Sequence, residues 1–443
     1  MKFYDRKAEL AQLERRREIA FSTHSQMTVL TGRRRIGKTM LIRKSCEHLT
    51  MVYLFVSRGN EAMLCNGFAK TINATLQNIF VPESTESFAD IFEMLMRAGR
   101  TEKFDLVIDE FQEFFYINPT VYSKMQDIWD RYKDTTHVNL VASGSVYTLM
   151  TRIFQDSHEP LYGRCDSIIK LRPFTTDILK EILADYKPDY TKEDLLALYT
   201  FTGGVPKYID LFMQDGCTDV SAMIANMVQP DSPFLNEGNA LLIQEFGKKY
   251  GNYFAVLADI ASGRSTLPEL EKNMGDTNIA GHIRRLEEDY ELIAKKRPIF
   301  AKEGTQTVRF EISDLFLRFW FRYFVKYRPL VELENYALLG ELIKHDYQTY
   351  SGLTLEMYFR QKMVESKEYI NIGSWWQAKK GKDACEIDIV GIKADGRTAV
   401  VAEVKRQKKN FKPEDFAKKM EMIKNKVLSK YEIQPVCLTM EDM

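Results

Sequence analysis

The chain has 443 residues, of which 45% are hydrophobic, and this length suits roughly two to four domains with sizeable cores. Lysine plus arginine and aspartate plus glutamate both number 62, so the whole chain has no general attraction to nucleic acid. No apolar run approaches the ~18 residues of a membrane span, and the first residues lack the apolar core of a signal peptide. Six cysteines and six histidines show no metal-ligand spacing. We therefore expect a cytoplasmic, multidomain globular protein with no membrane partner.

Residues 1–175 alternate short apolar runs with segments of helical period. This alternation is typical of an α/β domain in which helices cover a parallel sheet. Four runs are expected to form buried strands, at 27–31, 51–56, 104–109 and 138–143. Residues 1–175 should therefore fold as one α/β domain.

The run at 27–31 leads into GRRRIGKT, a Gly-x4-Gly-Lys-Thr motif that opens the next helix. A strand, a glycine-rich loop and a helix N-terminus in this order form a P-loop, whose backbone N–H groups cradle phosphates. Lys38 is expected to reach the β- and γ-phosphates of ATP, and the Thr39 hydroxyl to coordinate Mg²⁺. The three arginines of the loop are either filler or outer contacts. The predicted nucleotide-binding residues here are Gly32, Arg33, Arg34, Arg35, Ile36, Gly37, Lys38, Thr39 and Met40.

A second motif, which is acidic, also indicates binding and hydrolysis of a nucleotide. The stretch FDLVIDEF ends an apolar strand in Asp109 and Glu110, in the manner of a Walker B motif. Asp109 would orient the Mg²⁺ through its water shell, and Glu110 would polarise the attacking water. Ser143 and Ser145 follow the next strand, where a polar side chain is placed to sense the γ-phosphate. These residues predict a Mg-dependent ATPase.

Residues 176–238 change to a helical pattern with turns at 202–206 and 229–233, and they predict a small helical lid. Residues 239–331 give three helices followed by two short strands, which is the order of a winged helix-turn-helix. Its presumed recognition helix, 276–290, mixes arginines with three consecutive acidic residues. A structural or regulatory role is therefore supported at least as well as DNA reading.

Residues 332–443 are expected to form a helical connector (332–350), a helix, several strands and a basic helix. Asp388 and Glu403 lie inside apolar runs, where a charged side chain needs a partner or a metal. A period of two places Glu403 and Lys405 on one face of their strand. Two carboxylates on adjacent strands suit a hard cation such as Mg²⁺, and the Lys405 ammonium would orient water or stabilise charge at phosphorus.

The stretch from Lys405 to Lys430 contains ten basic and three acidic residues. Such a stretch is either a surface that follows nucleic-acid phosphates or a solvated helix face. Charge pattern alone supports both interpretations equally. The partner that this C-terminal basic region suggests is nucleic acid.

Several segments in a fixed order resemble the archaeal-type ATPases of the STAND/AAA-like P-loop class: FYDRKAEL, GRRRIGKT, VIDEFQEF, ASGSVYTLM, PLYGR, LRPF and TGGVPKYI. The resemblance covers most of residues 1–330. It implies that Phe3 and Arg6 lie near the adenine and that Pro206 contacts the base. It also implies that Arg164 acts as a sensor or arginine finger, the alternative being a surface ion pair.

The C-terminal pattern also resembles a known family. Glu356, Asp388, Glu403 and Lys405, in the order Glu…Asp-x14-Glu-x-Lys, resemble the catalytic core of the PD-(D/E)xK nucleases. The stretches FWFRYF and GSWWQ resemble the domain of unknown function that commonly follows these ATPases. The resemblance implies a small α/β nuclease-like domain at 332–443 in which Asp388 and Glu403 bind the metal.

The leading hypothesis is a Mg-dependent ATPase that binds ATP and ADP and couples nucleotide state to a winged helix and a nuclease-like, DNA-acting domain. The alternative is a nucleotide-dependent switch or scaffold whose C-terminal domain binds nucleic acid or protein without cutting. A weaker alternative is a winged-helix transcription regulator, against which the mixed charge of 276–290 argues. The choice of DNA or RNA and any oligomeric state stay open.

Overall fold

A computed structural model describes residues 1–247, 250–302, 308–377 and 385–443. The chain divides into two compact units. The first unit is Asp5–Arg172, and the second unit combines Met1–Tyr4 with Pro173–Met443.

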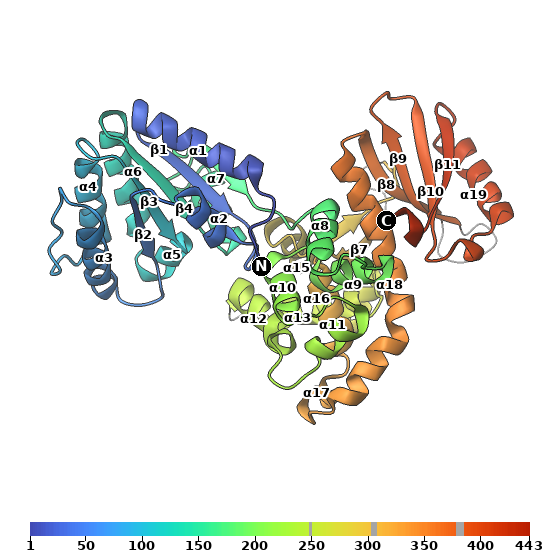
Figure 1. Cartoon of the computed structure of the whole chain (residues 1–443). Helices are drawn as coiled ribbons and strands as arrows, with labels where there is room; N and C mark the ends of the chain where they lie inside the picture. The colour runs from blue at the N-terminus through green and yellow to red at the C-terminus, as the bar shows by residue number, and fades with distance from the viewer. Residues whose placement is uncertain (248–249, 303–307, 378–384) are drawn as a thin grey trace. The chain divides into compact units, whose positions relative to one another are not determined.

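The first unit is built on a five-stranded sheet in the order β2-β3-β4-β1-β5, in which every pairing is parallel (Figure 1). The strands are β1 Gln26–Thr31, β2 Met51–Phe55, β3 Phe104–Asp109, β4 Val138–Ser143 and β5 Ser167–Lys170. The parallel sheet predicted from the sequence is confirmed. The fifth strand was not expected, since SIIK is a short edge strand with alternating exposure.

Helices cover this sheet, and they are α1 Lys7–Ser22, α2 Lys38–Ser45, α3 Glu61–Thr75, α4 Phe88–Ala98, α5 Phe114–Ile117, α6 Thr120–Tyr132 and α7 Tyr147–Gln155. Strands β1, β3 and β4 are buried along their whole length, as expected for central strands packed on both faces. Alternate residues of these strands, such as Val29, Leu106 and Ile108, join α3, α4 and α6 in one hydrophobic core. The helix that the P-loop motif was expected to open is α2, which ends at Ser45.

One buried ion pair ties α1 to the sheet. The Arg17 Nε donates to both carboxylate oxygens of Asp105 on β3, at 2.9 Å each. The Asn139 amide on β4 donates to the same carboxylate at 2.6 Å. Asp105 is fully buried, so its charge depends on these partners.

The second unit begins with helices and a two-stranded hairpin. Its helices up to residue 332 are α8 Thr176–Tyr186, α9 Lys192–Thr202, α10 Pro206–Gln214, α11 Val220–Met227, α12 Pro233–Phe246, α13 Tyr250–Ala261, α14 Leu267–Asn273, α15 Ala280–Arg284, α16 Leu315–Trp320 and α17 Arg328–Glu332. Strands β6 Ile293–Lys296 and β7 Arg309–Ile312 pair antiparallel. The aromatic stretch after Asp314 forms α16 and a π-helical turn, and its rings are buried in the core.

The C-terminal part of the second unit contains the helix α18 Tyr336–Ser366 and a four-stranded sheet in the order β11-β10-β9-β8. The other elements are β8 Tyr369–Gln377, β9 Cys385–Lys393, β10 Thr398–Val404, α19 Pro413–Lys426 and β11 Glu432–Leu438. Strand β11 pairs parallel to β10, and the other two pairings are antiparallel. The connector expected at 332–350 is not a separate element, because α18 runs through it without a break.

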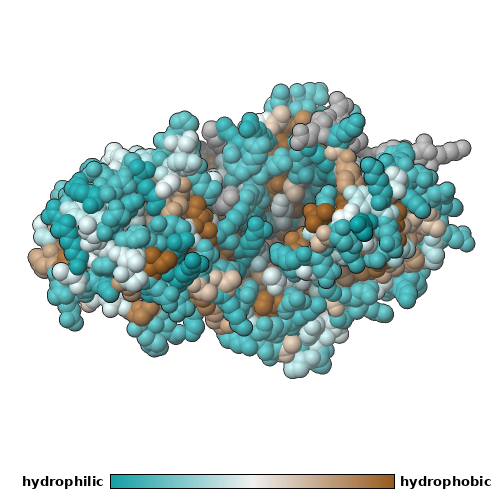
Figure 2. Space-filling view, turned by 90° about the horizontal axis from the view of Figure 1, so that it is seen from above, coloured by the Kyte–Doolittle hydropathy of each residue, from teal (hydrophilic) through white to brown (hydrophobic). Residues whose placement is uncertain are grey.

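The surface carries mostly hydrophilic residues. On the face drawn in Figure 2, hydrophobic residues occur in small scattered patches. Among the described ranges, no helix has both the length and the apolar character needed to cross a membrane.

We predict that Asp105→Ala destabilises the first unit by about 3–5 kcal/mol, because it leaves the Arg17 guanidinium buried without a counter-charge. Hydrogen exchange of the β3 and β4 amides in the full chain measures this loss. The matched control is Asp127→Ala, which removes an exposed carboxylate paired with Arg131 one helical turn away. It should cost less than about 1 kcal/mol. Equal exchange in the two variants would contradict the prediction.

Candidate functional site

The P-loop connects β1 to α2 and depends on two glycines. Gly32 and Gly37 have φ angles of 148° and 93°, which side chains disfavour. A Cβ at Gly32 would also lie 3.0 Å from the Leu171 carbonyl oxygen. The loop can therefore curl closely only with glycine at these positions.

Lys38 is the first residue of α2, and its side chain is buried under the P-loop. Its ammonium donates to the carbonyl oxygens of Gly32 at 2.8 Å and Arg33 at 3.1 Å. The positive charge is thus held inside the loop, where the helix N-terminus also favours an anion. Ile36 is buried in the loop, whereas Met40 is exposed.

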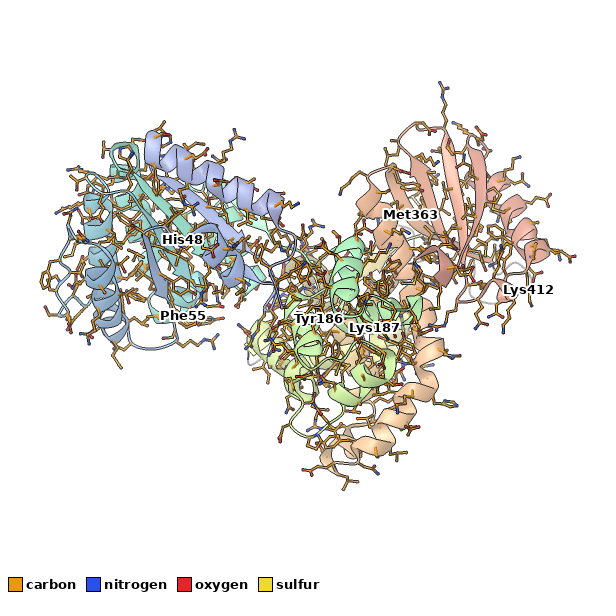
Figure 3. All side chains as sticks on the ribbon, in the orientation of Figure 1. His48, Phe55, Tyr186, Lys187, Met363 and Lys412 are labelled. Carbon is orange, nitrogen blue, oxygen red and sulfur yellow. The ribbon has the colours of Figure 1, made fainter. Side chains whose placement is uncertain are left out.

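The carboxylate of Asp109 joins the P-loop to the ends of β2 and β3. Its Oδ2 accepts from the Thr39 hydroxyl at 3.2 Å and from the Tyr53 hydroxyl. Its Oδ1 accepts from the backbone N–H of Glu110 at 3.0 Å. Burial, followed by the hydrogen bond to Asp109, raises the pKa of Tyr53. Phe55 pairs with Asp109 in the sheet, and its side chain is exposed at the end of β2 (Figure 3).

Glu110 is held in a fixed orientation at the carboxyl end of β3. Its φ of 55° lies in the left-handed region, which costs energy for a residue with a side chain. Its Oε2 accepts from the Gln112 amide at 2.5 Å and from the Ser145 hydroxyl at 2.6 Å. Ser143 is the last residue of β4 and fully buried, and its hydroxyl has no hydrogen-bond partner among the described residues. The predicted sensor segment is therefore linked directly to Glu110.

Arg6 connects the start of the first unit to the P-loop. Its Nη2 donates to the carbonyl of Arg172 at 2.7 Å and approaches that of Ile36 at 3.5 Å. Arg6 is buried, and its backbone is left-handed with φ of 70°. The structure thus places Arg6 against the backbone of the P-loop. Its predicted position near adenine stays a prediction.

Phe3 and Pro206 belong to the second unit, whereas the P-loop belongs to the first. Pro206 begins α10 after the TGGV turn, a position that suits proline. Gly204 in this turn has φ of 78°, and a Cβ there would lie 2.6 Å from the Phe174 carbonyl oxygen. Contacts of Phe3 and Pro206 with the base stay predictions.

Arg164 lies near the amino-terminal ends of the strands, whereas the P-loop lies at their carboxyl-terminal ends. Its guanidinium donates to the Asp130 carboxylate at 2.9 and 3.1 Å. Asp166, two residues later, hydrogen-bonds with Met27 near the start of β1. The P-loop follows the other end of β1, about 17 Å away for five strand residues. Within one chain Arg164 therefore forms the ion pair considered as its alternative role.

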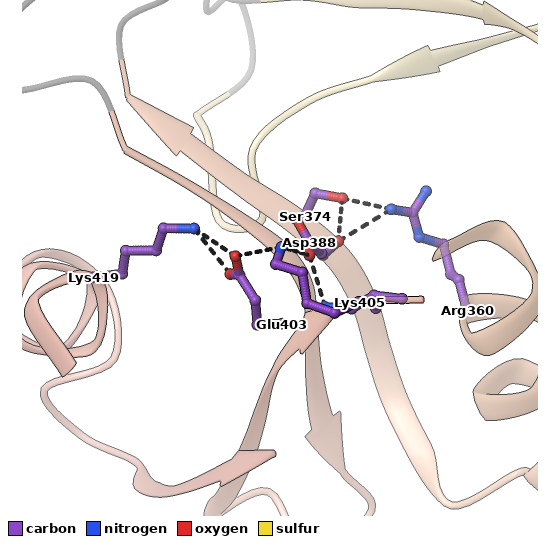
Figure 4. A network of polar contacts seen from close by, with 7 residues as sticks. Arg360, Ser374, Asp388, Glu403, Lys405 and Lys419 are labelled. Atoms are coloured by element: carbon purple, nitrogen blue, oxygen red, sulfur yellow. Dashed lines mark hydrogen bonds and ion pairs between the residues drawn. The ribbon is translucent and has the colours of Figure 1, made fainter. Parts of the chain in front are cut away.

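The predicted acidic pair of the second unit lies on adjacent strands. Ala402 on β10 pairs with Ile389 on β9, so Glu403 lies opposite Asp388. Lys405 contacts Glu403 at 2.9 Å and Asp388 at 4.0 Å, as Figure 4 shows. The structure therefore brings these three residues together on one face of the sheet.

Several further partners compensate the two carboxylates. Lys419 on α19 donates to both oxygens of Glu403 at 2.9 Å. Asp388 accepts from the backbone N–H of Val404 at 2.7 Å. Burial, followed by the charge of Glu403, nonetheless raises the pKa of Asp388. Burial alone would lower the pKa of Lys405, but the hydrogen bond with Glu403 raises it overall.

Glu356 projects from α18 near Asp388. Burial, followed by repulsion from Asp388, raises its pKa to about 8. No hydrogen bond or ion pair to Glu356 exists within the described residues. In that part of the chain, no three His, Cys, Asp or Glu side chains come close enough together to hold a metal. A cation here would therefore have two protein carboxylates as its main ligands.

The predicted basic stretch is only partly free for a ligand. Lys405 and Lys419 pair with Glu403, and Arg406 pairs with Glu193 of α9. Lys412, at the start of α19, is exposed (Figure 3). The other exposed lysines of this stretch are Lys408, Lys409, Lys418, Lys424, Lys426 and Lys430.

Sequence reasoning did not identify Tyr53, Gln112 or Lys419. Tyr53 contacts the site only because β2 and β3 are neighbouring parallel strands, whereas Gln112 reaches Glu110 through the local turn after β3. Lys419 was one lysine among many in a basic helix, and no spacing distinguished it.

The two matched families correspond to the two ends of the chain. Residues 3–212 match a family described as an ATPase domain predominantly from Archaea. Residues 320–419 match a family of archaeal and bacterial proteins of unknown function, DUF234. An uncharacterized protein of Methanocaldococcus jannaschii is 28% identical over 425 residues, which cover 94% of this chain and 90% of the relative.

Two solved structures align with most of this chain, and the one with a TM-score above 0.5 shows the same kind of fold. A Walker-type ATPase of Pyrococcus abyssi aligns with a TM-score of 0.55 at 17% identity, over 72% of this chain and 96% of that chain. The ORC2 protein of Aeropyrum pernix, in ADPNP-ADP complexes, aligns with a TM-score of 0.45 at 13% identity, over 75% and 96%. Residues 3–212 are thus similar to an archaeal-type ATPase domain and residues 320–419 to DUF234, and the Pyrococcus abyssi ATPase shares its fold with 72% of this chain.

Proposed function

We propose that this protein binds Mg-ATP at the P-loop of its first unit and hydrolyses it. The observation that carries the proposal is the network around Asp109, which joins Thr39 to Glu110 at the edge where the P-loop lies. Lys38 would compensate the charge of the β- and γ-phosphates. Glu110, oriented by Ser145, would polarise the attacking water.

The donor set at Thr39 and Asp109 fits Mg²⁺, since both residues offer oxygen atoms within hydrogen-bond distance of each other. When bound, the ion would neutralise charge on the phosphates. The chain's own residues perform the other tasks. Asp109 holds the Thr39 hydroxyl in place, and Tyr53 fixes the orientation of the Asp109 carboxylate.

The proposed output lies in the second unit. We divide the chain into an ATPase core (1–175), a lid (176–238), a winged helix (239–331) and a nuclease-like domain (332–443). The lid would couple nucleotide state to the winged helix, since a ligand shifts a lid through its different affinities for open and closed forms. We place this protein in the STAND/AAA-like class and in the cytoplasm. In an oligomer, Arg164 of one chain would act as an arginine finger at the nucleotide site of a neighbouring chain.

The second candidate activity is cleavage of nucleic acid at the acidic pair. It is favoured by the opposed carboxylates of Asp388 and Glu403, with Lys405 within 4.0 Å of both. The pair fits a divalent cation only if the cation displaces a lysine ammonium from Glu403, because both oxygens of Glu403 already accept from Lys419. The alternative is a domain that binds nucleic acid or protein without cutting it.

We predict that Lys38→Ala weakens binding of Mg-ATP by about 10- to 100-fold, the loss expected for a charge-assisted hydrogen bond. Glu110→Gln should keep nucleotide affinity and lower turnover by about 10²- to 10⁴-fold. Calorimetric titration and phosphate release measure the two effects. The control is Lys44→Ala, an exposed lysine of the same helix paired with Glu47. Unchanged affinity in Lys38→Ala would exclude this site.

We predict that Asp388→Ala abolishes divalent-dependent cleavage of nucleic acid by the full chain. Gel assays with Mg²⁺ or Mn²⁺ on DNA and RNA measure this loss. Asp415→Ala, an exposed carboxylate at the start of α19, is the matched control and should cut normally. Binding of either substrate without any cleavage by the unaltered protein would favour the scaffold alternative.

The raised pKa of Glu356 predicts a dependence of stability on pH. Between its ordinary pKa near 4.5 and about 8, the unfolded chain loses this proton while the folded chain keeps it. Stability is therefore lost as pH rises through that window. In EDTA, the melting temperature of Glu356→Gln should exceed that of the unaltered protein by an amount that grows from pH 4.5 to 8. Glu341→Gln, an exposed carboxylate of the same helix, should give a constant difference. A constant difference for both variants would contradict the prediction.

A further inference from the structure

A cavity of about 360 Å³ opens beside the acidic pair, entirely within the second unit. Its walls come from the β6–β7 hairpin, α16, α18 and the strands β8 and β9. Asp388 and Glu356 form part of this wall. The cavity is large enough for a small ligand, since such sites begin at about 300 Å³.

Most charged groups around the cavity are paired. Lys296 pairs with Glu311, Arg309 with Glu386, and Arg322 with Asp346. Each of these pairs joins one cation with one carboxylate, so the pair as a whole is neutral and does not attract a charged ligand.

Two arginines of the wall differ from the rest. Within the described residues, neither Arg318 nor Arg360 has a carboxylate within ion-pair distance. Arg318 contacts the Met357 sulfur at 2.9 Å and lies over the ring of Tyr350. Arg360 donates through one nitrogen to Ser374 and to the Asp388 carbonyl. Neither guanidinium therefore has an ion-pair partner among the described residues, and the acid whose charge Arg360 influences is Glu356, one helical turn away.

Two buried donors around the same cavity also lack partners in the described part of the chain. They are the Nε of Arg360 and the hydroxyl of Tyr350. A buried donor without an acceptor costs about 1–3 kcal/mol. An anion with several acceptor oxygens would satisfy such donors and compensate both guanidinium groups.

We propose that Arg318 and Arg360 bind a phosphate of a nucleic-acid strand in this cavity, which rests on the proposed action of the C-terminal domain on nucleic acid. Guanidinium groups suit phosphate because their planar fork matches two phosphate oxygens. Arg360 donates to the backbone of Asp388, so a phosphate held by it lies beside the acidic pair. The two arginines position the strand, and their contacts read no base.

A strand fits the site better than a free nucleotide. Trp376 and Tyr350 line the cavity, but arginine side chains lie over both rings, so the cavity presents cations to a strand rather than open aromatic faces. The exposed lysines of α19 belong to the same unit and would attract additional phosphates.

The test is binding of a fluorescein-labelled single-stranded oligonucleotide to the full chain in EDTA, followed by fluorescence anisotropy. Arg318→Gln and Arg360→Gln should each weaken binding about 10- to 100-fold. The slope of the logarithm of the binding constant against the logarithm of the salt concentration should become less steep by about one for each lost phosphate contact. Arg328→Gln, an exposed arginine of α17 paired with Glu332, makes the same charge change and should alter affinity less than twofold.

Folding and nucleotide binding are checked on the same samples. Each variant should keep its melting temperature and its affinity for Mg-ATP, since the cavity lies in the other unit from the P-loop. If a glutamine variant does not fold, Arg318→Lys and Arg360→Lys replace it. They keep the charge but lose the fork, and should weaken binding several-fold.

The outcomes distinguish the two proposals. If the unaltered protein binds oligonucleotide and both glutamine variants bind within twofold of it, the cavity is not the phosphate site. If the unaltered protein binds no oligonucleotide, the proposed action on nucleic acid fails as well. Displacement of the oligonucleotide by a nucleoside monophosphate at equal nucleotide concentration would overturn the assignment to a strand.

Discussion

The hydrogen bonds of the Asp109 carboxylate bring together residues that are far apart in sequence. Thr39 lies in the first turn of α2, Tyr53 belongs to β2, and Glu110 follows β3. They meet because β3 lies beside β2 in a sheet whose strands all point the same way. The parallel arrangement thus places the P-loop, the Asp109 carboxylate and Glu110 at one end of the sheet.

The second unit handles buried charge differently. Most carboxylates near its acidic pair have a cationic partner, and Glu403 has two. Glu356 has none among the described residues and avoids the cost of a buried charge by a raised pKa. Arg318 and Arg360 have no carboxylate within ion-pair distance among the described residues. Around the cavity, Glu356, Arg318 and Arg360 are thus the charged side chains without an ion-pair partner among the described residues.

Sequence patterns predicted the parts of the fold that depend on local order. The P-loop, the end of β3 and four of the five sheet strands follow from apolar runs and motif spacing. The opposed positions of Asp388 and Glu403 followed from a period of two on paired strands. Strand β5 has too few residues to show a pattern, since only four alternate in burial.

The remaining features depend on contacts that sequence spacing does not encode. Arg318 lies in an aromatic stretch that looks like core, and only the packing of α16 against α18 puts it beside Tyr350. Tyr53 was one aromatic residue in a predicted strand until the sheet order placed it next to Asp109.

Arg6 shows how the site and the rest of the chain are connected. The chain passes between the two units at Tyr4–Asp5 and again at Arg172–Pro173. Arg6 lies next to the first passage, and its guanidinium holds the Arg172 carbonyl at the second. The same guanidinium approaches the carbonyl of Ile36 in the P-loop. The hydrogen bonds of one guanidinium thus connect the P-loop backbone with the segments at which the chain passes between the two units.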